Sequence, residues 1–96
     1  MNYKICDKLI RKEERQDGEN VYSYELLMRE GDSVADFRLP LYSIKVDMTD
    51  KYGHKRQANA RDVFSSLDKA ADFFEKLVRN LATPIDLAYI LEDEMA

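Results

Sequence analysis

The sequence predicts an α+β fold, ββββαα, in which a four-stranded antiparallel meander is followed by two C-terminal helices that pack on one face of the sheet. Apolar and polar residues alternate, as they do in strands, up to about residue 63. From Leu67 onward the apolar residues recur at helical spacing, and the pair Thr83-Pro84 is typical of the start of a second helix. We therefore expect one domain over the 96 residues, with the sheet in 1–63 and the helical pair in 64–96.

The first two strands are predicted to form a hairpin around Asp17-Gly18, because a type I′ turn requires a positive φ at both of its central positions. This turn would set Leu9 opposite Leu26 and Arg11 opposite Tyr24. One face of the hairpin would then be mainly apolar and would belong to the core. Its members are Ile5, Leu9, Tyr22, Tyr24, Leu26 and Met28.

The third strand changes phase along its length. Apolar residues alternate in one phase from Phe37 to Leu41 and in the other from Tyr42 to Met48. Pro40 lies at the change, and since proline cannot donate a hydrogen bond to a ladder, we expect a bulge or break there. After the loop TDKYGHK, a weaker fourth strand is predicted from about Arg56 to Val63.

The first helix is predicted from a regular amphipathic pattern. Ser65 or Ser66 can cap its N-terminus, with Asp68 three residues after Ser65. Charged residues fill one side of the helix, and the apolar residues share the opposite arc, which would cover the sheet. The arc contains Leu67, Ala70, Ala71, Phe74, Leu77, Val78 and Leu81. The second helix is predicted to begin with Thr83 as N-cap and Pro84 as its first residue.

Composition excludes several classes of protein. Cys6 is the only cysteine, so the chain has no internal disulfide and no thiolate zinc cluster. No apolar run reaches the ~20 residues of a membrane helix, and the N-terminus is too polar for a secretory signal. The net charge of −4 resides in residues 65–96, which contain three basic and seven acidic side chains. We therefore expect a cytoplasmic protein without a generally basic, nucleic-acid-binding surface.

No set of residues indicates a catalytic centre, a cofactor site or a metal site. His54 is the only histidine, and no motif places a serine or cysteine beside it. Asp47, Asp50 and Gly53 lack the alternate ligands of a calcium loop. Cys6 fits a small buried residue in a strand better than a nucleophile. We expect no enzyme, and catalysis is kept only as a remote alternative.

The second helix carries apolar residues on more than one side, which favours an interaction surface. Leu87, Ala88, Leu91 and Met95 form one stripe. Ile85 and Tyr89 form another, Ile90 stands on a third side, and Phe73 lies at the margin of the first helix's arc. We therefore hypothesise a protein-contact site that joins some of these apolar residues to the acidic end of the helix. It comprises Phe73, Ile85, Tyr89, Ile90, Glu92 and Asp93. The alternative, that all the apolar residues cover the sheet, stays open.

The acidic end of the second helix opposes the helix dipole, which is unfavourable by about 0.3–1 kcal/mol for each well-placed group. Glu92 and Asp93 are therefore expected either to contact a cation or to lie past the last ordered turn of the helix. An internal partner could come from the hairpin cations Arg11, Lys12 and Arg15. A basic partner molecule is the other possibility.

A basic loop supports a second hypothesis. Basic residues beside an aromatic ring are typical of contacts with single-stranded nucleic acid or another anion. The candidate residues are Lys51, Tyr52, His54, Lys55 and Arg56. A solvated loop without function is the plain alternative, and the acidic chain disfavours nucleic acid.

Four segments, YSYELL, YSIKV, DVFSSLDK and TPIDLAYILEDEM, resemble an uncharacterised family of small Firmicutes proteins (Clostridia-type) known only as a domain of unknown function. That family has a tyrosine-containing early strand, a Tyr-Gly-Ile-x-Val strand, an Asp-Ile-Ser-like helix entry, and an end with Pro-x-His-Leu, an apolar pair and Glu-Asp. The matching residues are Tyr24, Leu26, Leu27, Tyr42, Ile44, Val46, Asp62, Val63, Ser65, Pro84, Leu87, Ile90, Leu91, Glu92 and Asp93.

The resemblance spans about residues 21–95 and implies a fold and a source, but no activity. Ser43 stands where the family has Gly, and Asp86 where it has His. The second departure removes the residue most easily imagined as chemical. Together, the observations favour a small cytoplasmic binding or regulatory protein whose C-terminal helices contact a protein partner or a second copy. The alternative is a weak nucleic-acid or nucleotide binder that uses residues 51–56.

Overall fold

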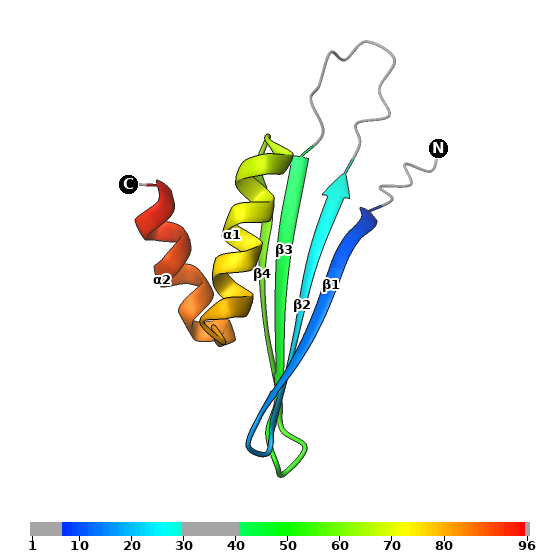
Figure 1. Cartoon of the computed structure of the whole chain (residues 1–96), viewed down its shortest axis with the longest axis vertical. Helices are drawn as coiled ribbons and strands as arrows, with labels where there is room; N and C mark the ends of the chain where they lie inside the picture. Colours follow the sequence, from blue (N-terminus) through cyan, green and yellow to red (C-terminus); the bar gives the residue numbers. More distant parts are fainter. Residues whose placement is uncertain (1–6, 30–40, 96) are drawn as a thin grey trace, which may run out of the picture.

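The computed structural model describes residues 7–29 and 41–95, which form four strands followed by two helices (Figure 1). The strands are β1 (Asp7–Asp17), β2 (Asn20–Arg29), β3 (Leu41–Thr49) and β4 (Lys55–Phe64). The helices are α1 (Leu67–Arg79) and α2 (Pro84–Met95). This order confirms the predicted α+β fold class. No helix in the described part of the chain is long and apolar enough to cross a membrane.

The strands form one antiparallel sheet in which each strand pairs with its neighbour in the chain. Residues opposite each other share a face, so the pair Leu26 and Ile44 lies with its neighbours on the face that the helices cover. α1 packs over β2 and β3, and α2 lies on the β4 side (Figure 1). The predicted apolar phase from Tyr42 to Met48 points into this core. The bulge predicted at Pro40 falls outside the described residues.

The turn between β1 and β2 lies one residue later than predicted. Because Asp17 pairs with Asn20, its central residues are Gly18 and Glu19. Gly18 has a φ of 62°, and Glu19 is not among the described residues with positive φ. A positive φ at the first central position alone is the pattern of a type II′ turn, not of the predicted type I′ turn.

β1 contains a register shift between Leu9 and Arg11. Arg11 lies opposite Leu26, and Leu9 lies opposite Leu27, so both predicted pairings are wrong. The shift turns Leu9 to the sheet face away from the helices, where its side chain is exposed. The placement predicted for Ile5 falls outside the described residues.

β4 is slightly longer than predicted, and its ladder with β3 is interrupted near Ser43. At the interruption Asp62 takes a φ of 54°, a conformation that aspartate tolerates better than most residues. Its backbone N–H donates a 2.9 Å hydrogen bond to the hydroxyl of Ser43. Beyond this irregularity Phe64 turns into the core.

α1 begins after Ser66, whose hydroxyl accepts a 3.4 Å hydrogen bond from the backbone N–H of Lys69. Ser66, and not Ser65, is therefore the N-cap. Leu67 is 45% exposed and Leu81 lies beyond the last helical turn, so neither belongs to the buried arc in which it was predicted. The buried residues are Ala70, Phe73, Phe74, Leu77 and Val78.

A Schellman motif ends α1. The N–H of Ala82 donates to the carbonyl of Leu77 at 3.0 Å, and the N–H of Leu81 donates to the carbonyl of Val78 at 3.2 Å. The motif places Leu81 in the left-handed region, with a φ of 50°. Glycine usually occupies this position, because a side chain there costs roughly 1–2 kcal/mol.

α2 begins as predicted, with Thr83 before the helix and Pro84 as its first residue. The Thr83 hydroxyl accepts from the N–H of Asp86 at 3.2 Å, and the Asp86 carboxylate accepts from the N–H of Thr83 at 3.0 Å. This reciprocal capping box satisfies two donors that a helix start leaves unpaired. Leu87, one turn into the helix, is 2% exposed and anchors α2 to the core.

Candidate protein-interaction surface

α2 presents two large apolar side chains to solvent. Ile85 is 58% exposed and Tyr89 is 68% exposed. They are four residues apart, so they lie on the same side of the helix, and Ala88 beside them is also exposed. Leu87 points into the core instead. We call Ile85, Ala88 and Tyr89 the α2 stripe; its role in binding stays a prediction.

Two other residues of the predicted contact site lie elsewhere. Phe73 is 1% exposed, and its ring lies 5.2 Å from that of Phe64. The prediction that Phe73 extends an exposed apolar area is therefore wrong: the turned end of β4 brings Phe64 against it and widens the buried arc of α1. Ile90 is half-buried and packs against the core, so it is at most the rim of an exposed surface.

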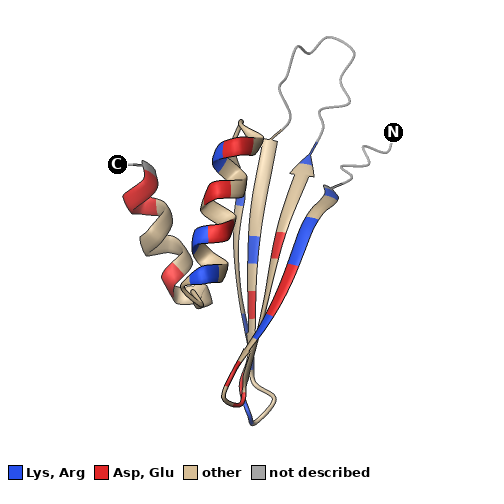
Figure 2. Cartoon of the chain, in the orientation of Figure 1, with Lys and Arg blue, Asp and Glu red and all other residues tan. Residues whose placement is uncertain are grey.

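The acidic end of α2 has an internal partner, but not the predicted one. Glu94 forms a 3.8 Å ion pair with Lys76 of α1. The hairpin cations instead pair with carboxylates of β1, β2 and α1. Glu92 and Asp93 are exposed and take part in none of the ion pairs found between described residues. α2 carries acidic and no basic side chains (Figure 2).

The turn between β3 and β4 is organised by Asp50. Its carboxylate accepts 2.9 Å hydrogen bonds from the backbone N–H groups of Tyr52 and His54. The pKa of Asp50 is lowered, chiefly by the hydrogen bond from His54, because these donors favour the charged form. His54 also lies 3.5 Å from the carboxylate through Nδ1. The predicted basic loop is therefore a closed turn built around a negative charge.

The five residues of the anion hypothesis are only partly brought together. Lys51 places its ammonium 5.0 Å from the centre of the Tyr52 ring, and Tyr52 is 72% exposed. Lys51 also pairs with Glu19 of the neighbouring turn, at 3.8 Å. Lys55 and Arg56 are adjacent in β4, so their side chains point to opposite faces of the sheet. The turn thus offers one aromatic ring and one or two cations to a ligand.

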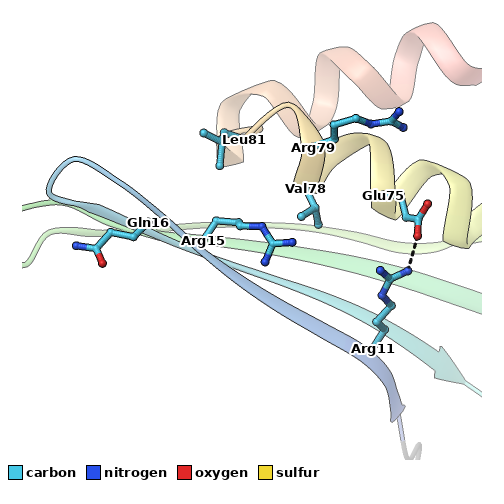
Figure 3. Close-up of a pocket in the computed structure, with 7 residues that line it drawn as sticks. All are labelled: Arg11, Arg15, Gln16, Glu75, Val78, Arg79 and Leu81. Carbon is cyan, nitrogen blue, oxygen red and sulfur yellow. Dashed lines mark hydrogen bonds and ion pairs between the residues drawn. The ribbon is translucent and has the colours of Figure 1, made fainter.

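A groove between β1 and α1 gathers arginines that the sequence-based site prediction missed (Figure 3). On β1, the side facing the helices carries Arg11 and Arg15, which lie opposite Leu26 and Tyr22. Arg79 lines the groove from α1. The sequence could have placed Arg11 and Arg15 on the side of β1 that faces the helices, because they pair with core residues of β2. This inference requires the correct register of β1.

A comparison with known families matches residues 3–96 to a family described only as being of unknown function, DUF6514. The chain belongs to this family. No curated protein and no solved structure shows a significant match to the chain. The match begins well before residue 21, so it takes in β1, which the resemblance of the short motifs left out.

The two departures from the motifs have structural roles. Ser43 accepts the hydrogen bond from Asp62 at the irregularity of β4, a role that glycine could not fill. Asp86 closes the capping box of α2. Both residues act locally on the backbone.

Proposed function

We propose that the chain is a small cytoplasmic binding or regulatory protein that contacts a protein partner, or a second copy, through α2. The observation that carries the proposal is the exposure of Ile85 and Tyr89, 58% and 68%, on one side of a helix whose other side is anchored by Leu87. From the motifs we also infer a source among the Firmicutes. We propose action by binding rather than by catalysis.

The chemistry of the α2 stripe suits a protein contact. A tyrosine supplies a large rigid surface with a polar end, and such residues dominate the energy of many interfaces. Ile85 extends the apolar area by one turn. Glu92 and Asp93 lie at the far end of the helix, where they could form a charged rim. The stripe therefore favours a partner with an apolar contact surrounded by basic groups.

A weaker second candidate is an anion or single-stranded nucleic-acid contact at the β3–β4 turn. It is favoured by the exposed Tyr52 ring with the ammonium of Lys51 beside it. Against it, Asp50 and Glu19 add two negative charges to the same end of the molecule. We rank it below the protein contact for this reason.

The double variant Ile85→Asp with Tyr89→Asp tests the proposal. It should fold as the wild type does and weaken self-association or partner capture at least tenfold, about 1.4 kcal/mol. Leu67→Asp is the control, because it also places an aspartate on an exposed apolar position, in α1, and adds one of the two charges of the double variant. Sedimentation and cross-linking in native cytosol, together with circular dichroism, provide the measurements.

Two results would speak against the α2 stripe. If the double variant unfolds while Leu67→Asp does not, Ile85 and Tyr89 belong to the core. If it folds and associates as tightly as the wild type, the contact lies elsewhere.

A further inference from the structure

The groove between β1 and α1 has a basic wall and an apolar floor. Its volume is about 630 Å³, within the range of roughly 300–1,000 Å³ that is usual for ligand sites. Arg11 and Arg15 rise from β1, and Arg79 lines the groove from the end of α1 with its guanidinium turned away from β1 (Figure 3). Leu81 supplies most of the apolar surface, because Val78 is only 8% exposed. The groove is open to solvent along its length.

The charges that line this groove are incompletely neutralised. Arg11 donates a 2.9 Å hydrogen bond to Glu75 and lies 5.3 Å from the centre of the Phe74 ring, so it is held in place. Arg15 pairs with Glu13 at 3.1 Å. Arg79 takes part in none of the ion pairs found between residues of the described ranges. The groove thus has three arginines against the carboxylates of Glu75 and Glu13, and Arg79 also borders a second hollow with Asp72 and Glu94.

Leu81 gives the groove an apolar side chain where the backbone favours glycine. Its φ of 50° is unfavourable for leucine, and its side chain is only partly buried against the core. Strained residues that persist in this way are enriched at binding sites. The leucine side chain widens the apolar floor beside Val78, next to the arginines. The groove therefore offers apolar contact and positive charge together.

The same chain carries a surface with the complementary features. The α2 stripe is apolar, and Glu92 and Asp93, which follow it, are exposed and acidic. Leu87 anchors α2 on the β4 side of the sheet, whereas Arg11 and Arg15 rise from β1 at the opposite edge, so α2 does not reach the β1 wall of its own groove (Figure 1). A contact between the α2 stripe and the β1 arginines of the groove therefore joins two molecules.

We propose that a second copy of this chain places its α2 stripe and acidic end in the arginine groove, an inference that rests on the proposed function of α2. A two-fold axis would fill both grooves of a dimer at once, since the contact made by one molecule is repeated by its partner. Glu92 and Asp93 meet Arg15 and Arg79, while Ile85 and Tyr89 cover Val78 and Leu81. The charge pairs set the register and make association weaken as salt rises.

A charge swap between two variants tests the pairing. The groove variant carries Arg15→Glu and Arg79→Glu, and the tail variant carries Glu92→Arg and Asp93→Arg. Each alone brings like charges together, so its self-association should weaken at least tenfold. When the two are mixed, both contacts of the dimer again join opposite charges, and a mixed dimer should form. Native mass spectrometry distinguishes the mixed dimer when one variant is isotopically labelled.

Folding controls keep this experiment decisive. The tail variant places cations at the C-terminal end of α2, where they are favourable, so it should fold at least as well as wild type. Arg79→Glu alone serves if the groove variant is unstable, because Arg79 forms none of the described ion pairs on which the hairpin depends. Raising the salt from about 50 mM to about 500 mM should weaken the wild-type dimer, because screening shortens the reach of the charges.

The outcomes separate this proposal from the proposed function. A wild type that stays monomeric up to about 500 μM has a free energy of association weaker than about 4.5 kcal/mol. This result overturns the second copy as occupant and leaves the α2 stripe free for another protein. If Ile85→Asp with Tyr89→Asp abolishes the dimer but neither charge variant does, the groove is wrong and the stripe stands. Loss in both charge variants with rescue on mixing supports the groove. It does so even if the stripe variant still dimerises, in which case the proposed role of the stripe fails.

Discussion

The hydroxyl of Tyr24 in β2 donates a 2.9 Å hydrogen bond to the backbone carbonyl of Ala82, in the link between α1 and α2. Both residues are fully buried. Carbonyl groups at a helix end have no partner within the helix and usually accept hydrogen bonds from water. This bond gives the buried carbonyl of Ala82 a partner and holds the link against the centre of the sheet. Together with the burial of Leu87, this bond from Tyr24 helps to fix the position of α2 and the orientation of the α2 stripe.

Tyr24→Phe should therefore destabilise the fold by about 1–3 kcal/mol, because it leaves the carbonyl of Ala82 buried without a partner. Urea unfolding followed by circular dichroism gives the free energy. Tyr52→Phe is the control: its side chain is 72% exposed, and the change should be within about 0.5 kcal/mol. Equal stability of the Tyr24→Phe variant and the wild type would mean that water or a shift of the link replaces the bond.

Alkaline pH should weaken the fold through the same tyrosine. Burial raises the pKa of Tyr24 from 10.0 to about 12, and the neighbouring Tyr22 contributes in the same direction. A raised pKa means that the folded state holds the proton more tightly than the unfolded state. The contribution to stability is thus complete below pH 10 and is lost as the pH rises through 12. Absorbance titration should show a tyrosine that ionises near the upper value, and Tyr24→Phe should remove that step.

The order of elements was predictable because each element has its own period or cap. The alternation in β2 and β3, the arc of α1 and the Thr83-Pro84 start of α2 act over short distances, and the structure contains all of them. The pairing of β1 was not predictable in the same way. The pair Asp17-Gly18 is compatible with two turn types, which set β1 and β2 in different registers. The residue pattern of β1 also does not indicate the register shift between Leu9 and Arg11.

The candidate site likewise has some features that a single helix determines and others that depend on packing between elements. The sequence places Ile85 and Tyr89 on a different side of α2 from Leu87, because this follows from the wheel of a single helix, but which side is exposed is known only from the packing. The burial of Phe73 and the gathering of Arg11 and Arg79 in one groove depend on how elements pack across the chain. Phe73 lies at the margin of its helical arc, so its environment is decided by the turned end of β4, not by α1.

The core of α1 should be intolerant of truncation. Phe74→Ala and Leu77→Ala should each destabilise by about 2–5 kcal/mol, a large share of the stability of so small a fold. Both side chains are fully buried. Phe73→Ala should now behave in the same way, contrary to a surface role. Thermal melts compare these variants with Leu67→Ala, which should lie close to wild type; core variants that melt with it would refute the packing of α1.

Nucleic acid should bind weakly. The chain has a net charge of −4, and the β3–β4 turn sets Asp50 and Glu19 beside its cations. We expect dissociation constants above ~10 μM for random oligonucleotides at physiological salt. Fluorescence anisotropy over a salt series measures this. Sub-micromolar binding that Lys55→Glu with Arg56→Glu abolishes would place the nucleic-acid function ahead of the protein contact.

Position 81 should reverse the usual ranking of alanine and glycine. Leu81 occupies the left-handed position of the Schellman motif, with a φ of 50°. Leu81→Ala loses the half-buried side chain and keeps the backbone strain, whereas Leu81→Gly loses the side chain and relieves the strain. The glycine variant should therefore be the more stable of the two by about 1 kcal/mol, whereas within a helix glycine is the less stable residue. Urea unfolding of both variants shows which of the two has the larger free energy of unfolding. An alanine variant that is equal or more stable would show that α1 does not end in this conformation in solution.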